Sequence, residues 1–168
     1  MTKMIKQLKE LLEMQQLLDY AIFTKKGIKE YPVQSMRIAL FVELGEMMNE
    51  FPTHFKHWKS TAKDDREKGL VEFVDSLHFA LSLSNYEKVQ LELEKNQAYL
   101  EYDMLDHDFQ IDKYELMWLL PDVVKYRGAQ RLHYLLMIGK YFGFTWDEIY
   151  NAYIEKNKVN YERIKNNY

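Results

Sequence analysis

Residues that break helices are scarce in this chain. Only six glycines and three prolines occur among its 168 residues, while the strong helix formers Leu, Glu, Lys and Met are plentiful. Apolar residues recur at spacings of three and four near the start, as at Leu8, Leu11, Leu12 and Leu18, and such spacing places them on one face of a helix. The sequence therefore predicts an all-α fold.

The first two expected helices are separated by a glycine and a proline. Residues 4–23 form the first helix, and Gly27 ends it. Pro32 suits the first turn of a second helix, which runs through MRIALFVELGEMMNE to the break at Phe51 and Pro52. The segment THFKHWKST that follows is expected to be a loop.

Capping signals predict where later helices begin. Asp64 and Glu67 have capping-box spacing, so a third helix is expected to start near Asp64 and to run through GLVEFVDSLHFALSLS. Residues 113–142 carry two apolar stretches, broken by a proline and a glycine, and are expected to form two shorter helices. Thr145 and Glu148 repeat the capping-box spacing ahead of the last helix.

One segment differs from the rest in composition. Residues 86–112 are dense in Glu, Lys and Asp, with Tyr and Leu between them, which indicates a solvated helical insertion. The length fits one domain that is large enough to bury its own core. We therefore expect a single domain over residues 1–168, with a four-helix core that carries two acidic helices and with an inserted helical region at about 86–112.

Composition and charge exclude several classes of protein. The chain has no cysteine, which rules out disulfides, thiolate zinc sites and a cysteine nucleophile. Its net charge of -3, with acids and bases interleaved, offers no broad cationic surface for duplex nucleic acid. No stretch approaches the ~20 apolar residues that span a bilayer, and the N-terminus lacks a continuous apolar segment, so we expect a cytoplasmic protein without membrane contact.

Two pairs of acidic residues interrupt otherwise apolar helical segments. Glu43 and Glu46 lie three residues apart within IALFVELGEMM. Glu72 and Asp75 repeat that spacing within LVEFVDSLHFAL. Residues three apart share one face of a helix, so antiparallel packing of the two helices would bring the pairs together. Neither segment contains a lysine that could neutralise them.

Four converging carboxylates would need a cation. Two like charges about 5 Å apart repel by roughly 3 kcal/mol at an effective dielectric constant near 20. Oxygen ligands with open water positions suit Mg²⁺, with Mn²⁺ as the alternative. The competing interpretation is that these acids are ordinary solvated residues on amphipathic helices, because a chain this acidic contains such a pattern by chance on the order of once.

Five segments carry a family resemblance: VELGEMMNE, FKHWK and EFVDSLHFALS in the middle, MQQLLDYAI near the start and AYIEKNKVNYER near the end. They resemble the dimeric dUTPase family of bacteria, phages and trypanosomatids, within the all-α nucleoside triphosphate pyrophosphohydrolase superfamily. The E-x-x-E and E-x-x-D helices that mark this superfamily match the two acid pairs, with 25 residues between them. The resemblance touches nearly the whole chain and is weakest over residues 86–140.

The resemblance implies an activity and a role for the acids. It implies Mg²⁺-dependent hydrolysis of dUTP to dUMP and pyrophosphate by water, without a covalent enzyme intermediate, and dUDP is a further candidate substrate. Glu43, Glu46, Glu72 and Asp75 would then bind the metal, and one of them, for which we choose Glu43, would orient or deprotonate the water. The resemblance also implies a homodimer, which the residues themselves do not establish.

Substrate contacts follow from the same resemblance. Gln15, with Asp19 one turn later, matches a glutamine that contacts the uracil edge, and an amide offers the required donor and acceptor. Trp58 and Lys59 match a tryptophan and a cation near the nucleotide and its phosphates. Helical spacing adds Phe79, which follows Asp75 by one turn on the same face and could stack on uracil. The alternatives are a surface glutamine, a phenylalanine packed in the core and a tryptophan that anchors a loop.

The last helix carries a polar row. Lys156, Asn160 and Arg163 recur at spacings of four and three, which places an ammonium, an amide and a guanidinium on one face. A solvated face would look similar, but the resemblance assigns Lys156 and Arg163 to phosphates and Asn160 to the nucleotide. His78 lies three residues after Asp75, and we interpret it as a packed or supporting histidine rather than a ligand of Mg²⁺.

Other functions remain open on the sequence alone. The nearest is a pyrophosphohydrolase for dCTP or a wider range of nucleotides, because only a few contacts select the base. A di-iron carboxylate bundle would need two Glu-x-x-His pairs, and no second pair is found. A non-enzymatic helical regulatory protein could use the 86–112 segment to bind a partner. An enzymatic and a regulatory role could also coexist, because some phage members of the family bind repressor proteins, but no residue here establishes such a partner.

Overall fold

The computed structural model describes residues 1–93, 95–101 and 112–166. Within these ranges every regular element is a helix, as the sequence predicts. The elements in chain order are α1 (Lys3–Lys26), α2 (Val33–Asn49), η1 (Pro52–His54), α3 (Arg66–Tyr86), η2 (Val89–Glu92), α4 (Gln97–Leu100), α5 (Lys113–Lys125), α6 (Gly128–Tyr141) and α7 (Trp146–Lys165).

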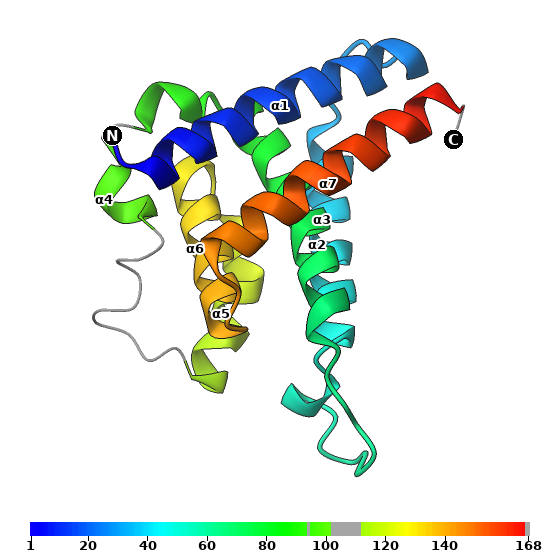
Figure 1. Ribbon diagram of the computed structural model, residues 1–168, viewed down its shortest axis with the longest axis vertical. Helices are drawn as coiled ribbons and strands as arrows, with labels where there is room; N and C mark the ends of the chain where they lie inside the picture. The colour runs from blue at the N-terminus through cyan, green and yellow to red at the C-terminus, as the bar shows by residue number, and fades with distance from the viewer. Residues whose placement is uncertain (94, 102–111, 167–168) are drawn as a thin grey trace.

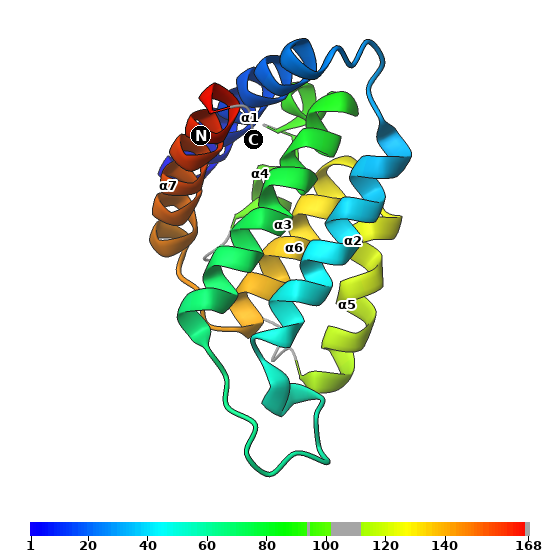
Figure 2. The ribbon, with the colours of Figure 1, turned by 90° about the vertical axis from the view of Figure 1, so that its right-hand side faces the viewer.

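Four of the helices form a bundle, and two more lie across it. Helices α2, α3, α5 and α6 run roughly parallel or antiparallel to one another, whereas α1 and α7 lie side by side and cross the bundle (Figures 1 and 2). Helix α3 packs against α1, α2, α6 and α7. The helix that carries the second acid pair is therefore at the centre of the fold.

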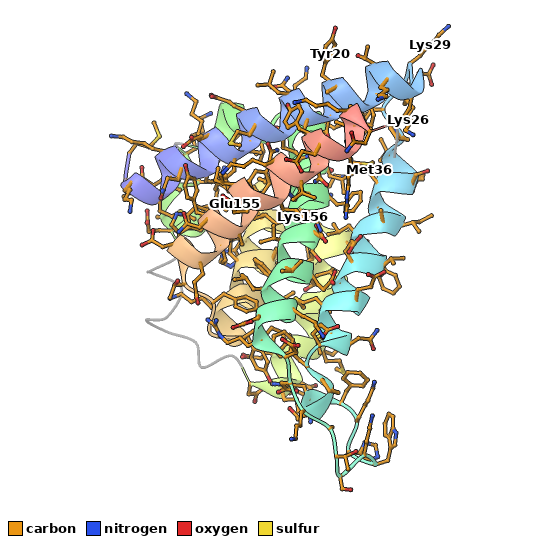
Figure 3. The ribbon with its side chains drawn as sticks, turned by 45° about the vertical axis from the view of Figure 1, so that its right-hand side comes forward. Tyr20, Lys26, Lys29, Met36, Glu155 and Lys156 are labelled. Atoms are coloured by element: carbon orange, nitrogen blue, oxygen red, sulfur yellow. The ribbon has the colours of Figure 1, made fainter. Side chains whose placement is uncertain are left out.

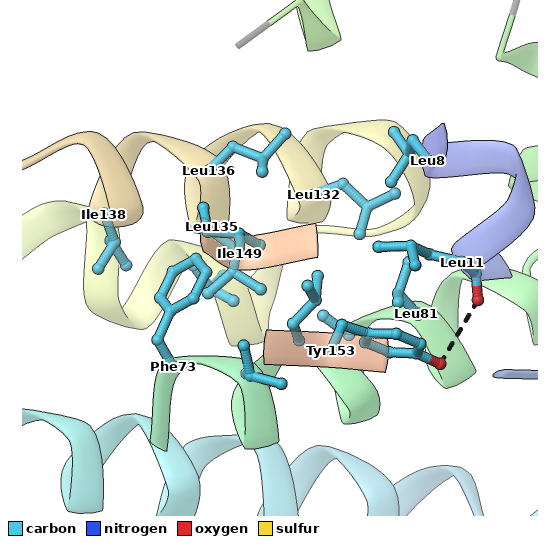
Figure 4. Packing of buried hydrophobic residues seen from close by; sticks show 14 of the residues in the cluster. Leu8, Leu11, Phe73, Leu81, Leu132, Leu135, Leu136, Ile138, Ile149 and Tyr153 are labelled. Atoms are coloured by element: carbon cyan, nitrogen blue, oxygen red, sulfur yellow. Dashed lines mark hydrogen bonds between the residues drawn. The ribbon is translucent and has the colours of Figure 1, made fainter. Parts of the chain in front are cut away.

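Buried apolar side chains from the bundle and from the crossing pair form one core (Figure 4). Tyr153 of α7 is fully buried, and its hydroxyl donates to the backbone carbonyl of Leu11 over 3.5 Å, which ties α7 to α1. The side chains around it come from four helices: Leu8 and Leu11 of α1, Phe73 and Leu81 of α3, Leu132, Leu135, Leu136 and Ile138 of α6, and Ile149 of α7.

Helix ends mostly follow the expected signals. Gly27 ends α1 with φ +66°, a left-handed conformation that glycine adopts without strain. Thr145 and Glu148 form the expected capping box of α7. Of the two breaks expected between the later helices, the one at Pro121 is wrong, because this proline lies inside α5. The break at Gly128 is confirmed, because α6 begins there.

The expected cap of the third helix is wrong by one residue. Asp65, not Asp64, accepts from the backbone N–H of Lys68 and caps α3. Asp64 instead accepts from the backbone N–H of Thr53 over 3.0 Å and from its hydroxyl over 2.6 Å. Both aspartates can cap a helix, and the contact that closes the loop between α2 and α3 decides which one does so.

The expected insertion is only partly described. Its described part forms the short helices η2 and α4, and the side chains of Val89, Leu93 and Leu100 are buried in the core. The expectation of a solvated segment is therefore wrong for these three side chains. Residues 94 and 102–111 lie outside the described part of the chain.

None of the helices in the described ranges is both long enough and apolar enough to cross a membrane.

Candidate active site

A cavity of about 400 Å³ lies where α1 and α7 cross α3 and the first half of α2. Figure 3 shows Lys156 at the point where α7 crosses α3, and Met36 on α2. The cavity is lined by Gln15, Leu18, Asp19, Ile22, Phe23, Lys25 and Lys26 of α1, by Met36 and Glu43 of α2, by Asp75, His78 and Phe79 of α3, and by Lys156, Asn160, Arg163 and Ile164 of α7.

Three of the four expected acids converge beside this cavity. One carboxylate oxygen each of Glu43, Glu46 and Glu72 lies within 4.8 Å of the other two. The convergence results from the packing of α2 against α3, since each helix turns its acid pair toward the other. Glu43 also lines the cavity, so the acid cluster and the cavity are continuous.

The electrostatics of this cluster favour a bound cation. Burial and the nearby charges of Asp75, Glu46 and Glu72 raise the pKa of Glu43 from its ordinary 4.5 to about 7. Burial, followed by the charges of Asp75 and Glu46, also raises the pKa of Glu72. Carboxylates that resist ionisation in this way lose their mutual repulsion when a divalent cation binds between them, and an all-oxygen donor set suits a hard ion.

Asp75 has a different environment from the other three acids. Lys156 of α7 donates to its Oδ2 over 2.5 Å, and both side chains are largely buried. The acidic segments contain no lysine of their own, but α7 supplies one from 81 residues further along the chain. Asp75 is thus beside the cluster and lines the cavity, but in this structure its charge is balanced by Lys156.

The α1 wall of the cavity is hydrogen-bonded to α3 and α7. Gln15 is buried, and its Oε1 lies 2.7 Å from Nδ1 of His78 and 2.9 Å from the hydroxyl of Tyr153. Its Nε2 donates to Asp19 over 2.8 Å, and the hydroxyl of Ser82 donates to the other oxygen of Asp19 over 2.6 Å. The neighbouring Gln16 is exposed, so Gln15 is the glutamine that can face a ligand here.

His78, which the sequence suggested only as a packed or supporting residue, lines the cavity and contacts both Gln15 and Tyr153. Its ring stacks on that of Tyr153, with centroids 4.2 Å apart and an interplanar angle of 18°. Burial, together with the charge of Lys156, lowers the pKa of His78 to about 3, so its imidazole is neutral at physiological pH. Sequence reasoning also missed Ser82. His78 follows Asp75 by three residues and Ser82 follows His78 by four, so all three share one face of α3. This spacing is the sequence signal that could have identified Ser82 as part of the site.

The cationic side of the cavity comes from both ends of the chain. Lys156, Asn160 and Arg163 all line it, as their shared helix face predicted. Lys25 and Lys26, in the last turn of α1, line it as well and were not foreseen. Lys25 donates through Nζ to the carbonyl of Ile164, which brings the ends of α1 and α7 together.

Of the three further residues expected to contact the nucleotide, one lines the cavity and two do not. Phe79 is half-buried and lines the cavity. Trp58 and Lys59 do not line it, because they lie in the loop between α2 and α3, which extends beyond the bundle (Figure 2). Trp58 is 69% exposed, and the ring of His57 makes an edge contact with it, the centroids being 5.0 Å apart.

Comparison with models of protein families identifies a family for this chain. A family model described as dUTPase matches residues 7–168, which is nearly the whole chain. Comparison with curated proteins gives no match.

Proposed function

Because the chain belongs to the dimeric, all-α dUTPase family and is a dUTP diphosphatase, we propose that it hydrolyses dUTP to dUMP and pyrophosphate with Mg²⁺, or Mn²⁺ in its place, at the acid cluster of α2 and α3. The observation that carries this proposal is the convergence of Glu43, Glu46 and Glu72 within 4.8 Å beside a cavity lined by cations. The family match decides against the di-iron and the non-enzymatic regulatory alternatives.

The acid cluster would hold the cation. Glu43, Glu46 and Glu72 supply converging oxygens, and Asp75 joins them when Lys156 turns from it toward a phosphate of the substrate. A cation held there would neutralise triphosphate charge and make a nearby water easier to deprotonate. Lys156 then has two roles, because it balances Asp75 in the free enzyme and contacts a phosphate oxygen in the complex.

Glu43 is our choice for the group that accepts the proton from the attacking water. Glu43 and Asp75 are the acids of the four that line the cavity, and Asp75 is already paired with Lys156. As the water oxygen forms its bond to phosphorus, the bridging P–O bond breaks and pyrophosphate leaves from dUMP. No side chain forms a bond to phosphorus in this scheme.

The uracil end of the substrate would lie toward α1. Gln15 has a second amide N–H that its contact with Asp19 leaves available for a uracil carbonyl oxygen. Phe79 lines the same space and can stack on the ring. Asp19 would act here through its bond to Gln15, and dUDP, which carries the same base, is a further substrate.

The phosphate end would lie toward α7 and the loop. Arg163 and Lys156 line the cavity as partners for phosphate oxygens, and Asn160 lies between them on α7 as a contact for the nucleotide. Trp58 and Lys59 would contact the nucleotide only if their loop moved toward a site. Their exposure in the isolated subunit is compatible with such a movement.

We further propose a homodimer that forms through α2 and α5. Ile38, Phe41 and Val42 of α2 are between 48% and 64% exposed, and α5, which lies beside α2 (Figure 2), adds exposed Met117 and Trp118. Together they form a neighbouring set of exposed large apolar side chains, and such a patch on a folded subunit is typical of an interface with another protein chain. A second copy of this chain would cover the patch on both subunits at once.

The activity proposal is tested by pyrophosphate release from dUTP, dCTP, dTTP and UTP, with and without Mg²⁺. We expect turnover of dUTP alone, dependent on the cation and lost in Glu46→Gln. Glu155→Gln is the matched control, because Glu155 is an exposed acid of α7 outside the cavity lining (Figure 3).

Each other outcome corrects a different part of the proposal. Turnover of dCTP or of several bases would show a broader pyrophosphohydrolase. Equal activity without a divalent cation, or in Glu46→Gln, would overturn the role given to the acid cluster.

A further inference from the structure

A continuous chain of hydrogen bonds runs from the start of α2 to the cavity. The hydroxyl of Tyr31 lies 2.8 Å from that of Ser82, and Ser82 donates to Asp19. Asp19 in turn accepts from Gln15, whose Oε1 contacts His78. These five side chains are buried or half-buried, so water does not replace these bonds freely.

The two hydrogen bonds to Asp19 have a defined direction. The amide N–H of Gln15 donates to one carboxyl oxygen and the hydroxyl of Ser82 donates to the other, and both bonds oppose the rise in the pKa of Asp19 that burial causes. The amide of Gln15 is then oriented with its oxygen toward His78 and toward Tyr153, whose hydroxyl also donates to that oxygen over 2.9 Å. Because that oxygen can only accept, Nδ1 of the neutral His78 must carry the ring proton, and Nε2 is left as an acceptor.

We propose that Tyr31, Ser82 and Asp19 form an orienting chain that fixes the amide of Gln15. The fixed amide holds His78 in the tautomer that carries its proton on Nδ1. The Nε2 atom of His78 is then an acceptor for a hydrogen-bond donor of the nucleoside. This inference rests on the proposed function, since it assumes that the nucleoside occupies the cavity. In it Tyr31, Ser82 and Asp19 are positioning residues.

The free acceptor of His78 supports this inference. The residue is 6% exposed and lines the cavity. Its Nε2 is buried and has no hydrogen-bond partner within the described part of the chain. A buried acceptor without a partner is unusual in a folded protein. Because His78 lines the cavity, a ligand bound there could supply the missing donor.

The outer end of the orienting chain is held by aromatic packing. The ring of Tyr31 stacks on Tyr86, with centroids 4.5 Å apart and 10° between the planes. The ring of Phe23 makes an edge contact with it, the centroids being 5.8 Å apart. The phenol hydroxyl is therefore fixed beside Ser82, and Tyr31→Phe would remove the hydroxyl while keeping the packing.

An acceptor at this position would select for donors. Uracil carries an N–H at N3, where cytosine has a lone pair, so a bare Nε2 would favour uracil and repel cytosine. The 3′-hydroxyl of the deoxyribose is the other donor of the nucleoside. Both share the chemistry of a single N–H or O–H donor, and substrate analogues can separate them.

The tautomer can be measured directly from the imidazole ¹⁵N chemical shifts of His78. We expect wild type to show a protonated Nδ1 and a bare Nε2. Asp19→Asn should give a mixture of tautomers, because its new amide group can donate to the oxygen of Gln15 and allow the Gln15 amide to turn. Ser82→Ala should also shift His78 toward a mixture of tautomers. This substitution removes a hydrogen-bond donor that lowers the pKa of Asp19, so Asp19 would be protonated more readily.

Ser84→Ala is the matched control. Ser84 is on the same helix, is as fully buried as Ser82, and its hydroxyl has no hydrogen-bond partner among the described residues. Its removal should leave the His78 tautomer unchanged. A wild-type Nε2–H tautomer, or the same spectrum in Ser82→Ala, Asp19→Asn and Ser84→Ala, would overturn the inference.

The donor is identified by kcat/KM for dUTP, N3-methyl-dUTP and 2′,3′-dideoxyuridine triphosphate. If N3–H is the donor, the preference of wild type for dUTP over the N3-methyl analogue should fall about tenfold in Asp19→Asn. If the 3′-hydroxyl is the donor, the preference over the dideoxy analogue should fall instead. Unchanged ratios for both analogues would contradict the acceptor role of His78.

These readouts separate the inference from the proposed function. Wild type that hydrolyses dUTP without a divalent cation would overturn the proposed metal site, yet the ¹⁵N shifts would still decide the tautomer. A mixed tautomer in wild type would overturn the orienting chain and leave the metal site untouched.

Discussion

Charge balance at single residues divides the four acids into two kinds. Asp75 has Lys156 within 2.5 Å, whereas Glu43, Glu46 and Glu72 have mainly one another. The helical spacing of the acids predicted that the two pairs would meet if their helices packed against each other, and three of the four acids do converge. The pairing of Asp75 could not be predicted, because Lys156 reaches it from a helix 81 residues away, and only the crossing of α7 over α3 brings the two together.

The raised pKa of Glu43 predicts how the metal-free protein responds to pH. Folding raises this pKa from 4.5 to about 7, so between these values the folded state keeps a proton that the unfolded state has lost. Stability must therefore fall as pH rises through that window and level off above it. We expect the melting temperature of the metal-free protein to fall over this range.

Saturating Mg²⁺ should reduce this loss, because the cation replaces the proton between the carboxylates. Glu43→Gln should have a flatter profile in the absence of metal. Identical pH profiles for wild type and Glu43→Gln would contradict the assignment of this titration to Glu43. Differential scanning calorimetry in a chelator and in Mg²⁺ makes both comparisons.

At the scale of the element, α7 brings a polar row to the cavity. Its capping box and the spacing of Lys156, Asn160 and Arg163 were readable from the sequence, and the structure places all three in the lining. The contribution of Lys25 and Lys26 was not readable, because it depends on α1 and α7 ending at the same side of the fold (Figure 1).

Removing one cation of this row should weaken substrate binding. We expect Arg163→Ala to raise the KM for dUTP about tenfold, as the loss of one charge-assisted contact to phosphate would. Inhibition by dUMP, which lacks two of the phosphates, should change less. Lys158→Ala is the control, since Lys158 is exposed on the same helix, pairs with Glu155 and is outside the cavity lining. Equal effects of the two substitutions would refute the phosphate role.

The start of α3 depends on a close contact with the loop before it. A Cβ placed on Gly69 would lie 2.3 Å from Cζ of Phe51, and that ring is buried and stacks on Phe142 with centroids 4.0 Å apart. We expect Gly69→Ala to lower the free energy of unfolding by about 1–3 kcal/mol, because the ring has little room to move.

A double-mutant cycle tests whether the contact with Phe51 is the cause. In Phe51→Leu the ring is gone, so adding Gly69→Ala should cost much less than it does in wild type. Urea denaturation of the four proteins gives the coupling free energy. Additive effects would mean that Gly69 is required for another reason.

For the whole molecule, the class of fold was predictable from the sequence, but the burial of residues in the 86–112 segment was not. Scarce helix breakers and regular apolar spacing predicted an all-α chain around a four-helix core. The charge density of residues 86–112 suggested a solvated segment, yet Val89, Leu93 and Leu100 are in the core. Average composition hides such residues, because a few apolar side chains at the correct positions decide which face of a segment is buried.

The exposed apolar face of α2 leads to a prediction about assembly. A charge at the centre of a dimer interface must lose its hydration without gaining a partner, which is strongly unfavourable. We therefore expect Ile38→Glu to convert a dimer into monomers in sedimentation or light-scattering measurements. Leu17→Glu on α1 is the matched control, because Leu17 and Ile38 are equally exposed at 64% in the isolated subunit.

The pattern of the two results locates the interface. Monomers from Ile38→Glu and dimers from Leu17→Glu would support assembly through α2 and α5. The reverse pattern would place the interface on α1, and a monomeric wild type would rule out the homodimer. Activity should be measured in the same samples. Trp58 and Lys59 are exposed and lie outside the cavity lining of their own subunit, so a dimer could bring them to the site of the other subunit. If the monomeric variant binds Mg²⁺ but fails to hydrolyse dUTP, the second subunit must complete the site.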